Sequence, residues 1–166
     1  MTPQVREVTL SEYEETGRVT ALAYREFVRP QDTDWETYLE TIADVSARAA
    51  RTMVLIATED GRVLGSATLE LDGRTDPDDE RLGSTEAHIR MLGVDPDGRR
   101  RGVGSMLMRA CESRALAAGR RRMTLNTTQR MTAAQKMYES LGYVREEDRV
   151  FPDGFVLLSY TKELGG

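Results

Sequence analysis

The chain reads GVDPDGRRRGVGSML from Gly93 to Leu107, after an extended apolar run and before a predicted helix. Cations are disfavoured at a helix N-terminus by roughly 0.3–1 kcal/mol each, because that end already carries partial positive charge. A strongly anionic ligand, bound by free backbone N–H groups and flanking guanidinium groups, would offset this cost. Gly102 and Gly104 would let such a ligand approach the main chain closely. The stretch therefore predicts a phosphate-binding loop.

Length and composition narrow the class of protein. The sequence has 166 residues, a net charge of −5 and one cysteine, Cys111. This length fits one domain with a sizeable core, which we expect to span residues 1–166. The negative charge argues against nonspecific binding to nucleic acid or anionic membranes, and a lone cysteine excludes a disulfide framework and a cysteine-based zinc site. With no apolar signal core and no run of about 18 apolar residues, we expect a cytoplasmic protein without a metal.

Apolar periodicity and turn residues divide the chain into strands and helices. Strands are expected at 5–10, 53–58, 63–71, 85–94, 123–128, 144–150 and 155–161. Helices are expected from Ser11 to Pro30, from Asp32 or Asp34 to Arg51, from Gly102 to Gly119, and at 132–141. Ser11 and Glu14 fit a capping box at the first helix, and Gly119 fits the end of the third. The order predicts one mixed α/β domain.

Two common phosphate-binding patterns do not fit the loop. A Walker loop needs Gly-Lys-Ser/Thr, and a dinucleotide fingerprint needs a third glycine where Leu107 stands. The pattern that remains, Arg99-x-x-Gly102-x-Gly104, resembles the pyrophosphate-binding motif Gln/Arg-x-x-Gly-x-Gly/Ala of the GNAT family of N-acetyltransferases. The segment 134–143, AQKMYESLGY, resembles the second signature of that family, and the order of elements agrees along nearly the whole chain.

The resemblance implies an α/β (α+β) fold with a mixed, mostly antiparallel central sheet of six to seven strands and about four flanking helices. Two central strands would splay apart at a bulge, which Gly93 suits, and the pantetheine arm of acetyl-CoA would pair with main-chain groups of Leu92, Gly93 and Val94. The loop residues that would bind the pyrophosphate are Arg99, Arg100, Arg101, Gly102, Val103, Gly104 and Ser105. Many members carry an asparagine where this chain has Met131, and Asn126 would substitute for it.

The reaction that the resemblance implies is direct attack of an amine on the acetyl thioester. Tyr138 matches the family tyrosine that donates a proton or hydrogen bond to the departing sulfur. For the general base, His88 occupies a position similar to a catalytic glutamate of histone-type members, and its unperturbed pKa of roughly 6.5 suits the role. Glu86 projects from the same strand face two residues earlier. A relay through water alone is the third alternative.

The sequence says less about the acceptor substrate and about binding partners than about the cofactor. A primary amine is implied, on a small polyamine, an aminoglycoside-like compound, an amino acid or a protein N-terminus. The acidic loop from Asp72 to Gly83 would attract a cationic amine, although solvation alone also explains its charge. The alternative function is a non-catalytic acyl-CoA-binding sensor, against which Tyr138 argues. A nucleic-acid-binding module is disfavoured because no aromatic residues accompany the arginines. Many relatives dimerise, so a homodimer is one of the oligomeric states that the resemblance allows.

Overall fold

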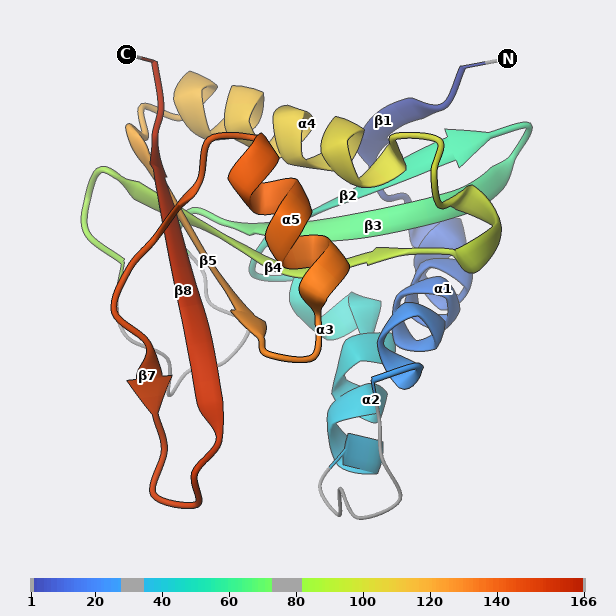
Figure 1. Cartoon of the computed structure of the whole chain (residues 1–166). Coiled ribbons are helices and arrows are strands. Elements are labelled where there is room, and N and C mark those ends of the chain that lie inside the picture. Colours follow the sequence, from blue (N-terminus) through green and yellow to red (C-terminus); the bar gives the residue numbers. More distant parts are fainter. Residues whose placement is uncertain (1, 28–34, 73–81, 166) are drawn as a thin grey trace.

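The architecture is described from a computed structural model that covers residues 2–27, 35–72 and 82–165 (Figure 1). The strands are β1 (Gln4–Glu7), β2 (Met53–Glu59), β3 (Arg62–Glu70), β4 (Glu86–Val94), β5 (Arg122–Thr128), β6 (Val144–Arg145), β7 (Arg149–Val150) and β8 (Val156–Glu163). The helices are α1 (Tyr13–Arg25), α2 (Trp35–Ala43), α3 (Val45–Ala49), α4 (Val103–Ala117) and α5 (Thr132–Ser140), with short 3₁₀ turns at Leu10–Glu12 and Pro96–Gly98. None of the helices in these ranges is long and apolar enough to cross a membrane.

The strands form one sheet in the order β1-β2-β3-β4-β5-β8-β6, with β7 also paired to β8. Neighbouring strands run antiparallel except β4 and β5, whose parallel register joins Glu86 to Arg122 and ends where Ile89 pairs with Leu125. Beyond that point β5 continues to pair with β8 as far as Thr128. The sheet therefore opens between β4 and β5, as the resemblance implied.

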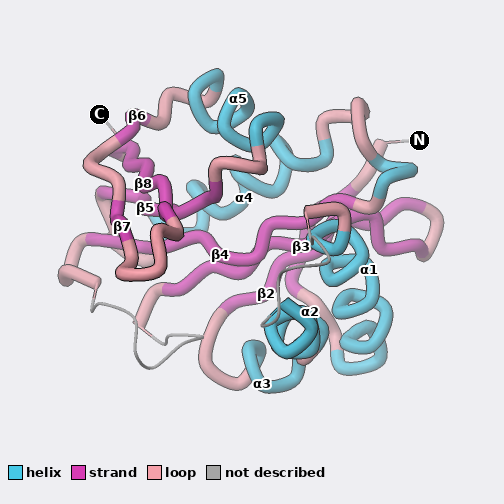
Figure 2. Tube along the Cα trace, turned by 60° about the horizontal axis from the view of Figure 1, so that its bottom comes forward, coloured by secondary structure: helices cyan, strands magenta, loops and turns pink. Residues whose placement is uncertain are grey.

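Helices cover both faces of this sheet. Figure 2 shows α4 and α5 on one side and α1, α2 and α3 on the other. The main core lies under α4, where Leu107, Met108 and Cys111 pack with apolar side chains of the sheet. Smaller clusters lie on the opposite face, including one in which Leu39 and Ile42 of α2 pack with Met91 of β4. The predicted mixed α/β fold is confirmed.

Two expected elements are each divided in the structure, so residues 2–27, 35–72 and 82–165 contain eight strands rather than the expected seven and five α-helices rather than the expected four. The expected second helix breaks because the Asp44 side chain accepts a hydrogen bond from Ala47 N at 3.2 Å and caps α3 separately. The expected strand at 144–150 breaks because an acidic turn interrupts it, in which Arg145 Nη2 lies 2.8 Å from Asp148 Oδ2. Local polar contacts, not the apolar pattern, decide both divisions.

The start of the first helix also differs from expectation. The capping box uses Thr9 and Glu12 rather than Ser11 and Glu14, and Thr9 N donates to Glu12 Oε1 at 2.9 Å. β1 accordingly ends at Glu7. Glu12 also binds the Arg6 guanidinium, and this contact lowers the pKa of its carboxyl to about 2. The pair ties β1 to the turn that begins α1.

The burial of residues near the end of α4 follows the apolar pattern only in part. In α4, Met108 and Ala115 are buried, whereas Ala117 and Ala118 at its end are exposed, although alanine would fit a buried helix face. Gly119 follows with a φ of +82°, as expected of a C-terminal cap. The positions Pro30, Asp32 and Asp34, and the acidic residues of 73–81, lie outside the described residues. Asp72, at the start of the acidic loop, binds Arg120 Nη2 at 2.6 Å.

Candidate active site

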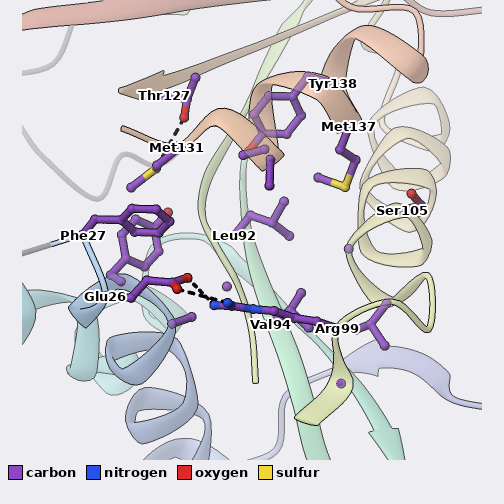
Figure 3. Close-up of a pocket in the computed structure, with 18 of the residues that line it drawn as sticks. Glu26, Phe27, Leu92, Val94, Arg99, Ser105, Thr127, Met131, Met137 and Tyr138 are labelled. Atoms are coloured by element: carbon purple, nitrogen blue, oxygen red, sulfur yellow. Dashed lines mark hydrogen bonds and ion pairs between the residues drawn. The ribbon is translucent and has the colours of Figure 1, made fainter. Parts of the chain in front are cut away.

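A cavity of about 520 Å³ lies where β4 and β5 separate (Figure 3). Its walls come from the end of α1, the second half of β4, the loop before α4, the end of β5 and the start of α5. Of the residues singled out in the sequence, the lining includes Leu92, Gly93, Val94, Arg99, Arg100, Gly102, Val103, Gly104, Ser105, Asn126 and Tyr138. One continuous space therefore joins the glycine- and arginine-rich loop to Tyr138.

A bulge in β4 shapes the floor of this cavity. Ser66 of β3 pairs with Gly93 and Thr68 pairs with Arg90, so a single β3 residue opposes two residues of β4. One of these two is Met91, whose φ of +53° is the left-handed conformation that strengthens a local bend. The bulge thus lies at Met91 and Leu92, not at Gly93 as expected.

Glycine is needed at position 93 because α1 packs closely against β4 there. A Cβ at this position would lie 3.1 Å from Ala23 Cβ and 3.4 Å from Thr20 Cα, so the missing side chain lets α1 approach β4. This contact brings the end of α1 to the cavity, where Ala23 is part of the wall. Gly93 therefore sets the spacing of the two walls.

The loop before α4 presents backbone donors and positive charge to the cavity. Gly102 is the N-cap of α4 with a φ of +76°, and the first-turn N–H groups after it have no partner within the helix. Arg100 also has a positive φ, of +66°, and lines the cavity. The Arg101 side chain binds Glu59 of β2, and Arg101 is not part of the lining. Free amides and cationic side chains at a helix N-terminus fit a pyrophosphate group.

Tyr138 of α5 stands at the other end of the cavity. The residue is 6% exposed, and its ring packs with two other tyrosine rings, whose centroids lie 5.9 Å (Tyr160) and 6.1 Å (Tyr143) away. Burial is the main cause that raises the pKa of the Tyr138 hydroxyl, and the nearby Tyr160 adds to it. The phenol therefore stays protonated at neutral pH and is a hydrogen-bond donor there.

His88 and Glu86 are not part of the cavity lining. His88 lies four residues before Leu92 on β4, about 13 Å along an extended strand. It is buried, and its Nδ1 lies 2.7 Å from Thr124 Oγ1 of β5. Glu86 Oε1 accepts a hydrogen bond from Gly83 N at 2.8 Å. The structure thus brings Tyr138 and the loop together, but not these two residues.

Several cavity residues have no signal in the sequence that predicts their position. They include Ala23, Tyr24, Glu26, Phe27 and Thr127. Ala23 and Phe27 have helical spacing, which predicts a buried face but not a cavity wall. Asn126 lines the cavity and accepts a hydrogen bond from Ser159 Oγ at 3.1 Å, whereas Met131 Sδ accepts one from Thr127 Oγ1 at 3.4 Å. In residues 2–27, 35–72 and 82–165 no cluster of three or more His, Cys, Asp or Glu side chains could hold a metal ion.

The cavity lies between two diverging strands and has the arginine-containing loop at one end. Residues 15–143 match the model of the acetyltransferase (GNAT) family. A comparison with curated proteins gives no match. Because the matched segment spans most of the sequence, the chain belongs to the GNAT acetyltransferase family, as the two motifs predicted. Membership implies acyl transfer from acetyl-CoA.

Solved structures support the same fold. A GNAT acetyltransferase from Desulfovibrio desulfuricans is 18% identical with a TM-score of 0.73, over 99% of this chain and 100% of that chain. The ribosomal-protein-S18-alanine N-acetyltransferase of Escherichia coli is 18% identical with a TM-score of 0.71, over 99% and 96%. An acetyltransferase from Salmonella typhimurium, solved with its cofactor acetyl-CoA, is 16% identical with a TM-score of 0.70, over 100% and 96%.

Proposed function

We propose that this protein transfers the acetyl group of acetyl-CoA to a primary amine of a small molecule or peptide, by direct attack on the thioester. One observation carries the proposal: a single cavity connects the cationic loop at the start of α4 to the protonated hydroxyl of Tyr138. A cofactor anchored by its phosphates at the loop would extend along β4 and place its thioester near the tyrosine. The acceptor amine would then complete the site.

The loop and β4 would hold the cofactor mainly through their backbone. Main-chain groups of Leu92, Gly93 and Val94 have no β5 partner, because the parallel pairing ends at Ile89, so they are free to pair with the pantetheine amides as an added strand would. The first-turn N–H groups of α4, with the guanidinium groups of Arg99 and Arg100 and the Ser105 hydroxyl, would bind the pyrophosphate. Arg101, held by Glu59, would contribute its backbone amide alone.

Tyr138 would act on the leaving group. As the amine nitrogen bonds to the carbonyl carbon, the carbon–sulfur bond breaks and the electron pair goes to sulfur. The Tyr138 hydroxyl would donate a proton or hydrogen bond to that sulfur. Burial keeps the phenol protonated at neutral pH, which supports this role. Backbone N–H groups at the Met91–Leu92 bulge would stabilise the carbonyl oxygen, because a bulge leaves main-chain groups unpaired.

For the base we propose His88, acting through water because it does not line the cavity. We expect His88→Gln to remove the acidic limb of the pH profile of kcat/KM, because a general base accepts a proton only in its deprotonated form. The measurement is kcat/KM between about pH 5.5 and 9, with Thr124→Val as the control that removes the hydroxyl beside His88 Nδ1. An acidic limb that persists in His88→Gln assigns the base to Glu86 or to water alone.

The experiment that tests the function is release of free thiol from acetyl-CoA in the presence of a panel of amines. The panel should contain a polyamine, an aminoglycoside, free amino acids and a peptide with a free N-terminus. We expect thiol release with at least one acceptor, and an acetylated product of that acceptor by mass spectrometry. Binding of acetyl-CoA without turnover of any amine would favour the non-catalytic sensor. Absence of both binding and turnover would contradict the proposal.

A further inference from the structure

An ion pair crosses the cavity between the end of α1 and the loop before α4. Arg99 Nη1 donates to Glu26 Oε2 at 3.1 Å, and Arg99 Nη2 donates to Glu26 Oε1, so both ends of the guanidinium are engaged. Both residues belong to the cavity lining, and Figure 3 shows their side chains meeting within it. The carboxylate therefore occupies the donor pair of an arginine that lies beside the proposed phosphate site.

The geometry of this pair is the geometry with which arginine binds phosphate. A guanidinium offers two parallel N–H donors to the two oxygens of a carboxylate or of a phosphate, and the two acceptors compete for it. The side chains of Arg99 and Glu26 are 41% and 44% exposed, so water screens their attraction. Exposed ion pairs contribute little to stability. A more highly charged phosphate can therefore displace the carboxylate at small cost.

The neighbouring pair of Arg101 and Glu59 provides a contrast within the same loop. It is also an arginine–glutamate contact, and Arg101 is 40% exposed. Neither Arg101 nor Glu59 belongs to the cavity lining, so a ligand in the cavity does not replace Glu59. The Glu26 pair is set apart by its position in the cavity, not by its chemistry.

We propose that Glu26 is a displaceable partner of Arg99: the Glu26 carboxylate holds the guanidinium before the cofactor binds and releases it to a phosphate of the incoming cofactor. The inference rests on the proposed function and adds a residue that tunes the affinity for the phosphate groups of the cofactor. Without a phosphate to replace the Glu26 carboxylate, the pair stays closed across the cavity. Because pantetheine carries no phosphate, it does not compete with the carboxylate for Arg99, so Glu26 lowers the affinity only for carriers with a phosphorylated end.

The test is calorimetric titration of the purified protein with coenzyme A and with pantetheine, which lacks the phosphates. Glu26→Gln removes the competing charge, so we expect coenzyme A to bind about two- to fivefold more tightly than to the parent protein at low salt. This gain should shrink as ionic strength rises. Pantetheine affinity should not change, and Glu59→Gln, the matched control, should alter neither affinity.

A double substitution shows whether Glu26 acts through Arg99. In an Arg99→Gln background, Glu26→Gln should have no further effect on coenzyme A affinity, because the two residues act as one pair. Weaker or unchanged binding of coenzyme A to Glu26→Gln overturns the inference, and so does an equal gain for pantetheine. If the parent protein binds no coenzyme A, the proposed function itself fails. If it binds and Glu26→Gln is neutral, only the role of Glu26 fails.

Discussion

Tyr138→Phe is expected to lower kcat by about tenfold or more while leaving the affinity for acetyl-CoA unchanged, because general-acid groups contribute at least that much. The substitution removes one hydroxyl and keeps the ring, which packs against Tyr143 and Tyr160. The loss should therefore appear in the chemical step and not in the cavity shape. Steady-state kinetics with a saturating amine, together with calorimetry of acetyl-CoA, separate the two effects.

Tyr160→Phe is the matched control for this prediction. It deletes the hydroxyl of a neighbouring ring that does not line the cavity and whose oxygen lies 3.4 Å from Glu139 Oε2. We expect its kcat to stay close to that of the parent protein. Because burial raises the pKa of Tyr138, any loss of activity due to its ionisation should begin only above the usual tyrosine pKa of about 10. Unchanged turnover in Tyr138→Phe would remove the residue from the mechanism.

The sequence predicts the fold well because its strands and helices have strong local patterns. The position of the bulge in β4 could not be predicted from the local pattern, because it depends on how β4 pairs with β3. Met91 has no glycine-like freedom, yet it adopts a φ of +53° because Ser66 and Thr68 fix the register on either side. Gly93 looked like the natural bulge residue but is needed for the approach of α1. Contacts between distant segments decided both positions.

The residues of the candidate site also fall into two groups, those that a local motif predicts and those that only the folded structure brings together. Loop residues such as Gly102 and Arg99 are contiguous in sequence, so a motif identifies them. Glu26 enters the cavity from α1, and no local pattern relates it to a loop 73 residues later. The alternation rule correctly indicates that His88 and Glu86 share a strand face, but it does not show how far the cavity extends along β4. Distance along the strand places both outside the lining.

The three arginines that first suggested an anionic ligand are partly explained by carboxylates of this chain. Arg99 binds Glu26 and Arg101 binds Glu59, and both partners lie far away in the sequence. The cost of cations at the start of α4 is thereby reduced before any ligand binds. The strongest support for a phosphate site is thus the open space beside the first turn of α4, and not the number of arginines.

Gly104→Val is expected to weaken acetyl-CoA binding by filling that space. A Cβ at Gly104 would lie 3.0 Å from Met137 Sδ and 3.8 Å from Val94 Cγ2, and all three residues line the cavity. Gly104 does not have a positive φ, so the backbone itself tolerates other residues. The valine methyl groups would also occupy space that the pyrophosphate would otherwise fill, so we expect a loss of affinity of about fivefold or more, or about 1 kcal/mol or more. Calorimetric titration with acetyl-CoA measures it.

Gly104→Ala is the smaller substitution, and it distinguishes a loss of acetyl-CoA affinity from a loss of folding stability. Its single methyl group meets the end of a flexible methionine, Met137, which can move aside, so the loss of affinity should be smaller than for valine. Alanine is also about 1 kcal/mol more favourable than glycine within a helix, so the melting temperature of Gly104→Ala should not fall. Weakened binding that increases from alanine to valine, without a parallel loss of stability, places the ligand against the first turn of α4. Equal affinity in all three proteins would show that no ligand approaches the backbone there.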